Sequence, residues 1–131
     1  MSLSIKIATL FICLLLIVGC SSVASKSEKN WLGYTESGKA SFYADKHQQR
    51  KTANGEVYKH GLNTAAHKTL PFGARVKVTN LENSKSIVVK VNDRGPFVRG
   101  RIIDLSKSAF SAIGNTSSGV MNVKIEVVNY P

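Results

Sequence analysis

Cysteine is scarce in this sequence, which holds only 2 in 131 residues. Cys13 lies inside an apolar run near the N-terminus, and Cys20 follows shortly after the end of that run. We expect the run to be removed and Cys20 to be modified, which leaves no thiol for a disulfide or a metal ligand. The fold must therefore be stable without covalent cross-links.

No apolar run is long enough to span a bilayer comfortably, since the apolar stretch covers only residues 7–18. A single positive charge, Lys6, precedes it, which is typical of a secretory signal. The segment from Leu16 to Cys20 resembles a lipobox and predicts diacylation of Cys20 and a stable membrane anchor. With Ser21 next, we expect the lipoprotein at the outer membrane, facing the periplasm. The alternative is an ordinary cleavage site, for instance after Ala24.

Acidic residues are few, because 8 Asp and Glu stand against 18 Lys and Arg, giving a formal net charge of +10. Such a balance predicts an anionic partner. Nucleic acid is the usual one, but an exported lipoprotein does not meet it. We therefore expect membrane headgroups or the cell wall, with its peptide carboxylates, as the partner. A basic surface that only keeps the protein soluble is the alternative.

The predicted organisation has three parts: a signal peptide over residues 1–19, a lipidated cysteine with a flexible tether over 20–37, and one small folded domain over 38–131. The tether is rich in Ser, Lys, Glu and Gly. Its larger apolar side chains include Trp31 and Tyr34, which either pack on the domain or offer a face for stacking on sugar.

Short β-type runs dominate the domain, at residues 40–43, 74–79, 86–91, 101–103 and 120–128. Several alternate apolar and polar residues, as half-buried strands require. One helix is predicted over residues 105–113, with Asp104 or Ser106 as its N-cap and Gly114 as a left-handed stop. The pattern therefore predicts a mainly β domain with one or two short helices.

Metal and cofactor sites have no support in the sequence. The three histidines, His47, His60 and His67, show no spacing that places two on one helix face. Phosphate-binding glycine loops and a nucleophile-elbow serine are also absent. We expect neither a metal nor a cofactor.

Between residues 38 and 128 the sequence resembles the rare lipoprotein A family. The matching stretches are Gly38–Tyr43, Thr52–Glu56, Thr64–Pro71, Val78–Leu81, Val91–Phe97 and Arg101–Ser106. The resemblance implies a six-stranded double-psi β-barrel. It also implies a lytic transglycosylase that cleaves peptidoglycan glycan strands, preferring strands stripped of their peptides.

The family's site residues map onto Glu56, His67 and Asp93. Cleaving a glycosidic bond needs a carboxylic acid that protonates the leaving oxygen. A lytic transglycosylase uses no attacking water, because the muramyl hydroxymethyl oxygen closes on its own anomeric carbon. One carboxyl group can then serve first as acid and then as base, and the product is an anhydro-muramyl sugar. We assign this role to Asp93, with a turn-forming aspartate as the alternative.

The remaining acids separate into two groups. Five lie in the tether, in turns or on a polar strand face, and these are Glu28, Glu36, Asp45, Glu82 and Glu126. Asp104 is expected to cap the helix, although related barrels in expansins and inverting endoglucanases carry an important aspartate in a similar position. Glu56 follows an Asn-Gly turn, so it is either an exposed loop residue or a helper in catalysis or sugar binding.

The basic candidates are His67, Lys68 and Arg94. His67 either makes a structural hydrogen bond or orients Asp93. Arg94 must point away from Asp93 or bind substrate, because an adjacent cation would lower the pKa of an acid that has to donate a proton. Together with Asp104, we expect Lys68 and Arg94 to bind substrate.

Two other functions remain open: an expansin-like module that binds and loosens glycan without cutting it, and a hydrolase in which a second carboxylate activates water. Many family members carry a C-terminal repeat that binds peptide-free glycan, whereas this sequence ends at Pro131. We therefore expect the barrel and its positive surface to supply the affinity for the cell wall. We also expect the protein to be a monomer.

Overall fold

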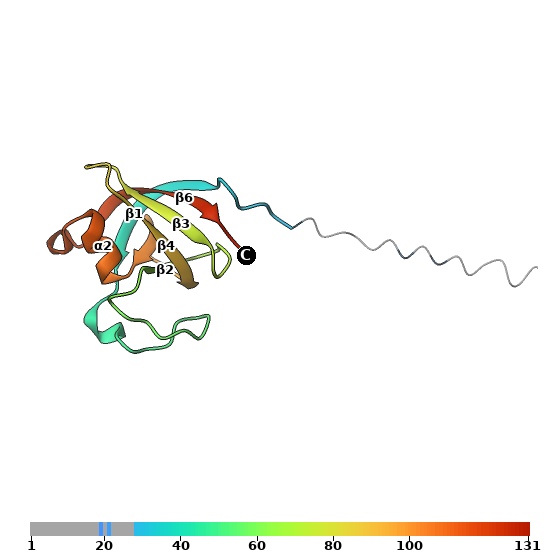
Figure 1. Cartoon of the computed structure of the whole chain (residues 1–131), viewed down its shortest axis with the longest axis horizontal. Helices are drawn as coiled ribbons and strands as arrows, with labels where there is room; N and C mark the ends of the chain where they lie inside the picture. The colour runs from blue at the N-terminus through green and yellow to red at the C-terminus, as the bar shows by residue number, and fades with distance from the viewer. Residues whose placement is uncertain (1–18, 20, 22–27) are drawn as a thin grey trace, which may run out of the picture.

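Six β-strands close into a barrel in the computed structural model, in the order β1-β5-β2-β4-β3-β6 (Figure 1). The strands are β1 (Thr35–Phe42), β2 (Thr64–His67), β3 (Arg75–Asn80), β4 (Ser86–Asp93), β5 (Arg101–Leu105) and β6 (Met121–Asn129). Two neighbouring pairs, β1 with β5 and β2 with β4, run parallel, and the other four pairs are antiparallel. The predicted six-stranded, mainly β fold is confirmed.

The structure describes residues 19, 21 and 28–131. Most of the predicted signal segment and the lipidation site at Cys20 lie outside the described residues. Within these residues, no helix is long and apolar enough to cross a membrane.

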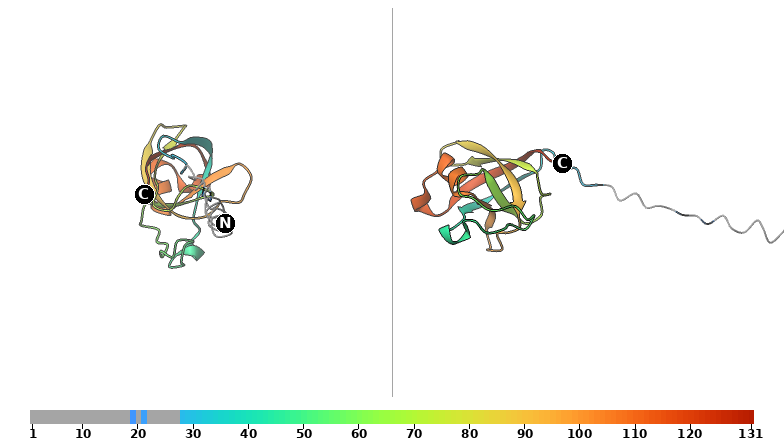
Figure 2. Two further views of the ribbon diagram at one scale, coloured as in Figure 1. Left: turned by 90° about the vertical axis from the view of Figure 1, so that its right-hand side faces the viewer. Right: turned by 60° about the horizontal axis from the view of Figure 1, so that its bottom comes forward.

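Alternating side chains build the core inside the barrel wall. Along β6 every second residue from Met121 to Val127 is buried, and the residues between them are exposed. Val76 and Val78 of β3 alternate in the same way. Viewed along the barrel, the strands form a closed ring (Figure 2, left). The period of two seen in the sequence therefore marks the inward-facing residues.

The strand β2 was not predicted, and its burial explains why. All four of its residues are buried, so neither face of β2 is open to solvent, and its two edges pair with β4 and β5. A strand of four residues that is covered on both faces shows no alternation of apolar and polar residues. The sequence signal for β2 is therefore a short run of small residues.

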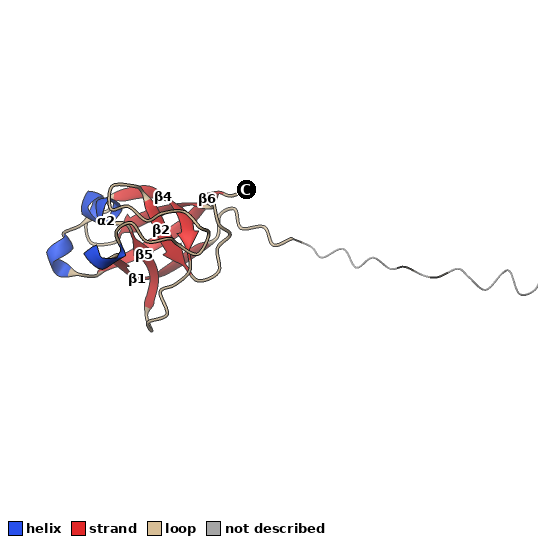
Figure 3. Cartoon of the chain, turned by 90° about the horizontal axis from the view of Figure 1, so that it is seen from below, coloured by secondary structure: helices blue, strands red, loops and turns tan. Residues whose placement is uncertain are grey.

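The helix α2 (Lys107–Ile113) closes one end of the barrel, where the two 3-10 segments η2 (Asp45–His47) and η3 (Thr116–Ser118) also lie (Figure 3). Ser106 is the N-cap, since its side chain accepts a hydrogen bond from Ala109 N. The prediction that Asp104 could cap the helix is wrong, because Asp104 belongs to β5.

The predicted left-handed stop at Gly114 is also wrong. Gly114 has φ −160°, which is extended backbone. A Cβ atom there would meet Met121 Cε, the end of a flexible side chain that can shift, so neither the conformation nor the packing at Gly114 requires glycine.

The strand β1 begins at Thr35, within the segment expected to be tether. Trp31 and Tyr34 are partly buried and pack against the core, with their ring centroids 5.4 Å apart. Packing is therefore the correct one of the two roles considered for these rings.

A long connection, residues 43–63, joins β1 to β2 and lies outside the barrel wall, below it in Figure 1. A single bridge, Lys51 with Val57, is its only β-pairing among the described residues. The backbone N–H of Asn54 donates to Asn92 O of β4 at 3.2 Å. This connection forms a wall beside the end of β4, where the candidate site lies.

Candidate functional site

A groove of about 390 Å³ lies where β1, β2, β4 and β5 end near one another. Its lining includes Ala66 of β2, Arg101 and Asp104 of β5, and the segment 93–98 that follows β4. The end of β1 and the start of the long connection supply the rest of the lining. The groove therefore contains the sequence candidates Asp93, Arg94 and Asp104.

The two aspartates lie at one level of the barrel wall. Ala66 is the register partner of Asp93 on one side and of Asp104 on the other. Because neighbouring strands are about 4.8 Å apart, the two aspartate backbones are separated by roughly 10 Å. The small Ala66 side chain leaves the space between them open. The fold thus presents a carboxyl group on each side of a shallow floor.

The carboxyl group of Asp93 is held by three donors. Its Oδ1 accepts from the backbone N–H groups of Ala53 and Arg94, each at 2.9 Å. Its Oδ2 accepts from the Tyr43 hydroxyl at 2.6 Å. A carboxylate oxygen has two lone-pair positions, so both positions of Oδ1 are filled and one position of Oδ2 is left. Oδ2 is therefore the oxygen through which Asp93 can exchange a proton.

Asp104 is fixed by two side chains. Its Oδ1 accepts from the Ser41 hydroxyl of β1 and from the guanidinium of Arg101. About one fifth of its side-chain surface is exposed (20%), next to the groove. Asp104 is thus a paired carboxylate of the barrel wall that can face a bound molecule.

The guanidinium of Arg94 points away from the Asp93 carboxyl group. It donates to Leu70 O at 2.9 Å and to His67 O at 3.3 Å, and it lies 3.9 Å from the centre of the Phe72 ring. Only the backbone N–H of Arg94 contacts the Asp93 side chain. Arg94 is thus oriented away from the Asp93 carboxyl group, and its part in substrate binding stays a prediction.

The His67 side chain does not contact Asp93. Its Nδ1 accepts from the backbone N–H groups of Thr69 and Leu70, each at 3.1 Å, so Nε2 carries the proton and donates to Glu36 Oε2 at 3.0 Å. Burial lowers the pKa of His67, and the Glu36 carboxylate offsets this only in part. A neutral ring with both nitrogens bonded supports the structural role considered for His67 rather than the orientation of Asp93.

Glu56 lies outside the groove lining. Its carboxylate accepts from Lys90 Nζ at 2.9 Å and from Asn54 Nδ2 at 2.6 Å. The Lys90 and Asn54 hydrogen bonds lower the pKa of Glu56, which suits an ion-paired carboxylate and not a proton donor. The same turn supplies the Ala53 N–H that donates to Asp93.

Lys68 is exposed and does not belong to the groove lining. Its place in substrate binding stays a prediction.

Sequence reasoning missed the groove residues Tyr43, His47, Phe97 and Arg101. Tyr43, Phe97 and Arg101 lie inside the stretches that resemble the family, so a signal existed, but their types did not point to acid–base chemistry. Phe97 is 80% exposed, which is unusual for a large apolar ring that lines a groove. Among residues 19, 21 and 28–131, no group of three or more His, Cys, Asp or Glu could hold a metal ion.

Relatives with established names share most of this chain's length. An endolytic peptidoglycan transglycosylase RlpA from Pasteurella multocida is 50% identical over 107 residues, which are 82% of this chain and 36% of that protein. The protein of the same name from Vibrio cholerae is 58% identical over 100 residues, 76% of this chain and 38% of that protein. The chain thus spans less than two fifths of each of these relatives.

Solved structures with the same barrel include the Streptomyces papain inhibitor, with a TM-score of 0.61, 26% identity and coverage of 75% of this chain and 97% of that one. The apo expansin of Clavibacter michiganensis also gives a TM-score of 0.61, at 21% identity, over 75% of this chain and 52% of that one. At that identity the expansin indicates a shared fold alone.

A family model described as "Lytic transglycolase" matches residues 35–125, from the first strand into the last. This range contains the groove, both aspartates and all the motif stretches on which the resemblance was based. The chain therefore belongs to the rare lipoprotein A family of double-psi β-barrel proteins.

Proposed function

We propose that this chain is a lytic transglycosylase that cleaves the glycan strands of peptidoglycan between N-acetylmuramic acid and N-acetylglucosamine. The observation that carries the proposal is the Asp93 carboxyl group, which keeps one oxygen position open at the groove while three donors fix the rest. The relatives named as endolytic peptidoglycan transglycosylases support the same substrate.

In the proposed reaction, Asp93 acts first as acid and then as base. The proton on Oδ2 passes to the glycosidic oxygen as the bond from that oxygen to the muramyl anomeric carbon breaks. The muramyl hydroxymethyl oxygen then bonds to the anomeric carbon, and its proton passes to Oδ2. No water is consumed, and the proton count of Asp93 is restored. The product is an anhydro-muramyl end.

Asp104 is suited to stabilise the positive charge that develops at the anomeric carbon. Its Oδ1 is held by Ser41 and Arg101, so the carboxylate has a fixed position across the Ala66 floor from Asp93. A preorganised negative group at this place favours a cationic transition state over the neutral substrate. We propose Arg94 and Lys68 as further substrate contacts, and Glu56 and His67 as residues that support the site from outside the groove.

Cleavage of defined strands tests the proposal. The full-length chain is incubated with peptide-stripped glycan strands and with intact, peptide-bearing strands, and bound and cut material are measured separately. We expect cutting of both, faster on stripped strands because no peptide must fit beside the groove. Binding without any cutting would instead identify an expansin-like module.

Phe97 is expected to form a stacking platform for a sugar ring. Phe97→Ala should raise the KM for stripped strands about fivefold with a smaller change in kcat, since an aromatic contact contributes roughly 1 kcal/mol. Phe97→Tyr keeps an aromatic ring and should therefore have the KM of the unsubstituted chain. Leu81→Ala, which removes an exposed apolar side chain outside the groove, is the control. An unchanged KM in Phe97→Ala would remove Phe97 from the binding surface.

The cellular setting belongs to the same proposal. We propose a cell-envelope protein with a signal peptide over residues 1–19, a diacylated Cys20 with its tether, and a catalytic barrel, anchored at the outer membrane and facing the periplasm as a monomer. The lipobox-like sequence before Cys20 and the relatives' names support this setting. Metabolic labelling with a fatty acid, compared with Cys20→Ala, tests the anchor.

Hydrolysis is the second candidate function, and one observation favours it. Asp93 and Asp104 lie on opposite sides of Ala66, and inverting glycosidases use two carboxyl groups about 6.5 to 9.5 Å apart, with water between them. In that case Asp104 would activate water, and ordinary reducing ends would form.

A further inference from the structure

Tyr43 joins the groove to the long connection between β1 and β2. It follows the last residue of β1, and its backbone N–H donates to Leu105 O of β5 at 3.1 Å. Its hydroxyl donates to Asp93 Oδ2 at 2.6 Å, the shortest of the three hydrogen bonds on that carboxyl group. Tyr43 is thus the only side chain among the described residues that hydrogen-bonds the reactive oxygen.

The Tyr43 ring is held from behind by Tyr58. The two rings are stacked, with centroids 4.2 Å apart and planes 26° from parallel. Tyr58 is 2% exposed, so its ring forms a rigid surface for Tyr43. His47 contacts the Tyr43 ring edge-on, with centroids 5.5 Å apart. The hydroxyl of Tyr43 therefore has little freedom to leave Asp93 by ring movement.

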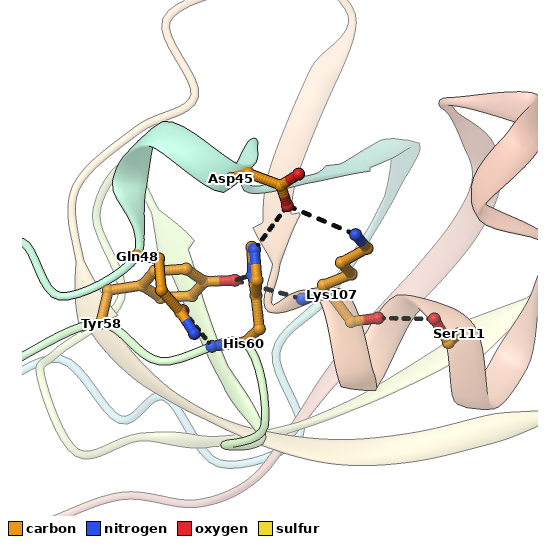
Figure 4. A network of polar contacts seen from close by, with 6 residues as sticks. All are labelled: Asp45, Gln48, Tyr58, His60, Lys107 and Ser111. Carbon is orange, nitrogen blue, oxygen red and sulfur yellow. Dashed lines mark hydrogen bonds and ion pairs between the residues drawn. The ribbon is translucent and has the colours of Figure 1, made fainter.

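A polar network fixes Tyr58 in turn (Figure 4). His60 Nε2 donates to Asp45 Oδ1 at 2.8 Å, which leaves His60 Nδ1 to accept the Tyr58 hydroxyl proton at 2.6 Å. The backbone N–H of Lys107 donates to the Tyr58 oxygen at 3.3 Å, and Lys107 Nζ donates to Asp45 at the same distance. Gln48 accepts from His60 N–H at 2.7 Å. The network ties the long connection to the start of α2.

Burial and the hydrogen bond to Asp93 both raise the pKa of Tyr43, so its hydroxyl stays protonated and acts as a donor. The other charged or titratable groups around Asp93 are His47 from η2, Arg94 beside it in the chain, and Arg101 and Asp104 from β5. Of these, only the backbone of Arg94 bonds to the Asp93 carboxyl group. Tyr43 is therefore the neighbouring side chain with the most direct influence on Oδ2.

We propose that Tyr43 is a positioning residue for the reaction, which aims the free position of Asp93 Oδ2 into the groove and stabilises the carboxylate between the two proton transfers. The proposal rests on the proposed role of Asp93. During the first step Tyr43 keeps its bond to one lone pair of Oδ2 while the proton leaves from the other. During ring closure the same bond holds Oδ2 toward the incoming hydroxymethyl proton.

Tyr43→Phe tests this proposal, because it removes the hydroxyl and keeps the stack on Tyr58. We expect kcat at its pH plateau to fall about ten- to a hundredfold, as for a misaligned reacting group, with KM changed less than about twofold. Loss of a donor to a carboxylate also favours its protonated form. The alkaline limb of the kcat profile should therefore move to higher pH.

The titration of the Asp93 carboxyl carbon, followed by NMR in the full-length chain, decides the proposal without any substrate. It should move to higher pH in Tyr43→Phe. It should move to lower pH when a fluorinated tyrosine, a stronger donor, replaces Tyr43, which covers the case that Tyr43→Phe fails to fold. Tyr130→Phe removes a hydroxyl that bonds to Asn30 outside the groove and should change nothing.

The outcomes separate the two proposals. An unchanged Asp93 titration in both Tyr43 variants would overturn the role of Tyr43, whatever the chain does to glycan. A chain that cuts no glycan, but whose Asp93 titration moves as expected, would overturn the proposed function and keep the contact.

Discussion

Replacing Asp93 by Asn should lower the rate of glycan cleavage by about a hundred- to ten-thousandfold and leave the fold intact. The amide oxygen can still accept from Ala53 N–H and Arg94 N–H, and the amide nitrogen can donate to the Tyr43 oxygen. The variant therefore keeps the same three partners, with the Tyr43 hydrogen bond reversed in direction, and loses the titratable proton and the negative charge. The cleavage rate is measured by the kinetics of strand cleavage. A thermal melt of the same sample shows whether the fold is intact.

Glu56→Gln is the matched control, because it makes the same carboxyl-to-amide change outside the groove. Its ion pair with Lys90 is partly exposed, and such pairs contribute on the order of 1 kcal/mol or less. We expect the rate to fall less than about tenfold. If Glu56→Gln abolished cleavage and Asp93→Asn did not, the two residues would have to exchange roles.

His67→Ala should destabilise the barrel by about 2–4 kcal/mol. The substitution leaves the backbone N–H groups of Thr69 and Leu70 without their acceptor, removes the shorter of two hydrogen bonds to Glu36 Oε2, and opens a cavity beside the core. The turn over residues 67–70 also carries the oxygen atoms that bind Arg94. Chemical denaturation measures the loss in the free energy of unfolding. We expect the cleavage rate to fall as the folded fraction falls.

The pH dependence of stability gives a second measurement on His67. Burial places its pKa in the folded protein below the unfolded value of about 6.5. Between these two values the unfolded chain binds more protons than the folded one. The stability contributed by neutral His67 is therefore complete above about pH 6.5 and is lost as the pH falls through the folded-state value.

His67→Asn separates structure from chemistry, since the asparagine oxygen can take the place of Nδ1 and accept from the same backbone groups. It should recover part of the stability, remove the pH-dependent component and keep measurable cleavage. A folded His67→Asn variant with no cleavage at all would show that the imidazole takes part in the reaction.

Local alternation in the sequence predicted a mainly β domain, whereas the barrel and the role of Asp93 were implied by the resemblance to the family. Alternation marks β3 and β6, and the Asp93 stretch stands out by its resemblance to the family. Sequence-based prediction failed where contacts between residues far apart in the chain determine the structure. The strand β2 has no alternation because it is covered on both faces, and Asp104 is bound by Ser41 of β1, 63 residues away in the chain, instead of capping α2.

Two acids set aside as tether or turn residues show the same limit. Glu36 lies on β1 and accepts from His67, 31 residues away, and Asp45 accepts from His60 and Lys107. A partner that far along the chain leaves no local pattern. Tyr43 was overlooked for the same reason, since its contact with Asp93 spans 50 residues.

Cleavage in water enriched in heavy oxygen distinguishes ring closure within the sugar, with Asp93 as acid and base, from hydrolysis. The full-length chain is incubated with stripped glycan strands in that solvent, and the new ends are weighed by mass spectrometry. Ring closure predicts ends that are lighter by one water than reducing ends and that carry no heavy oxygen. Reducing ends with no anhydro-muramyl ends would show instead that water is consumed and that the chain is a hydrolase.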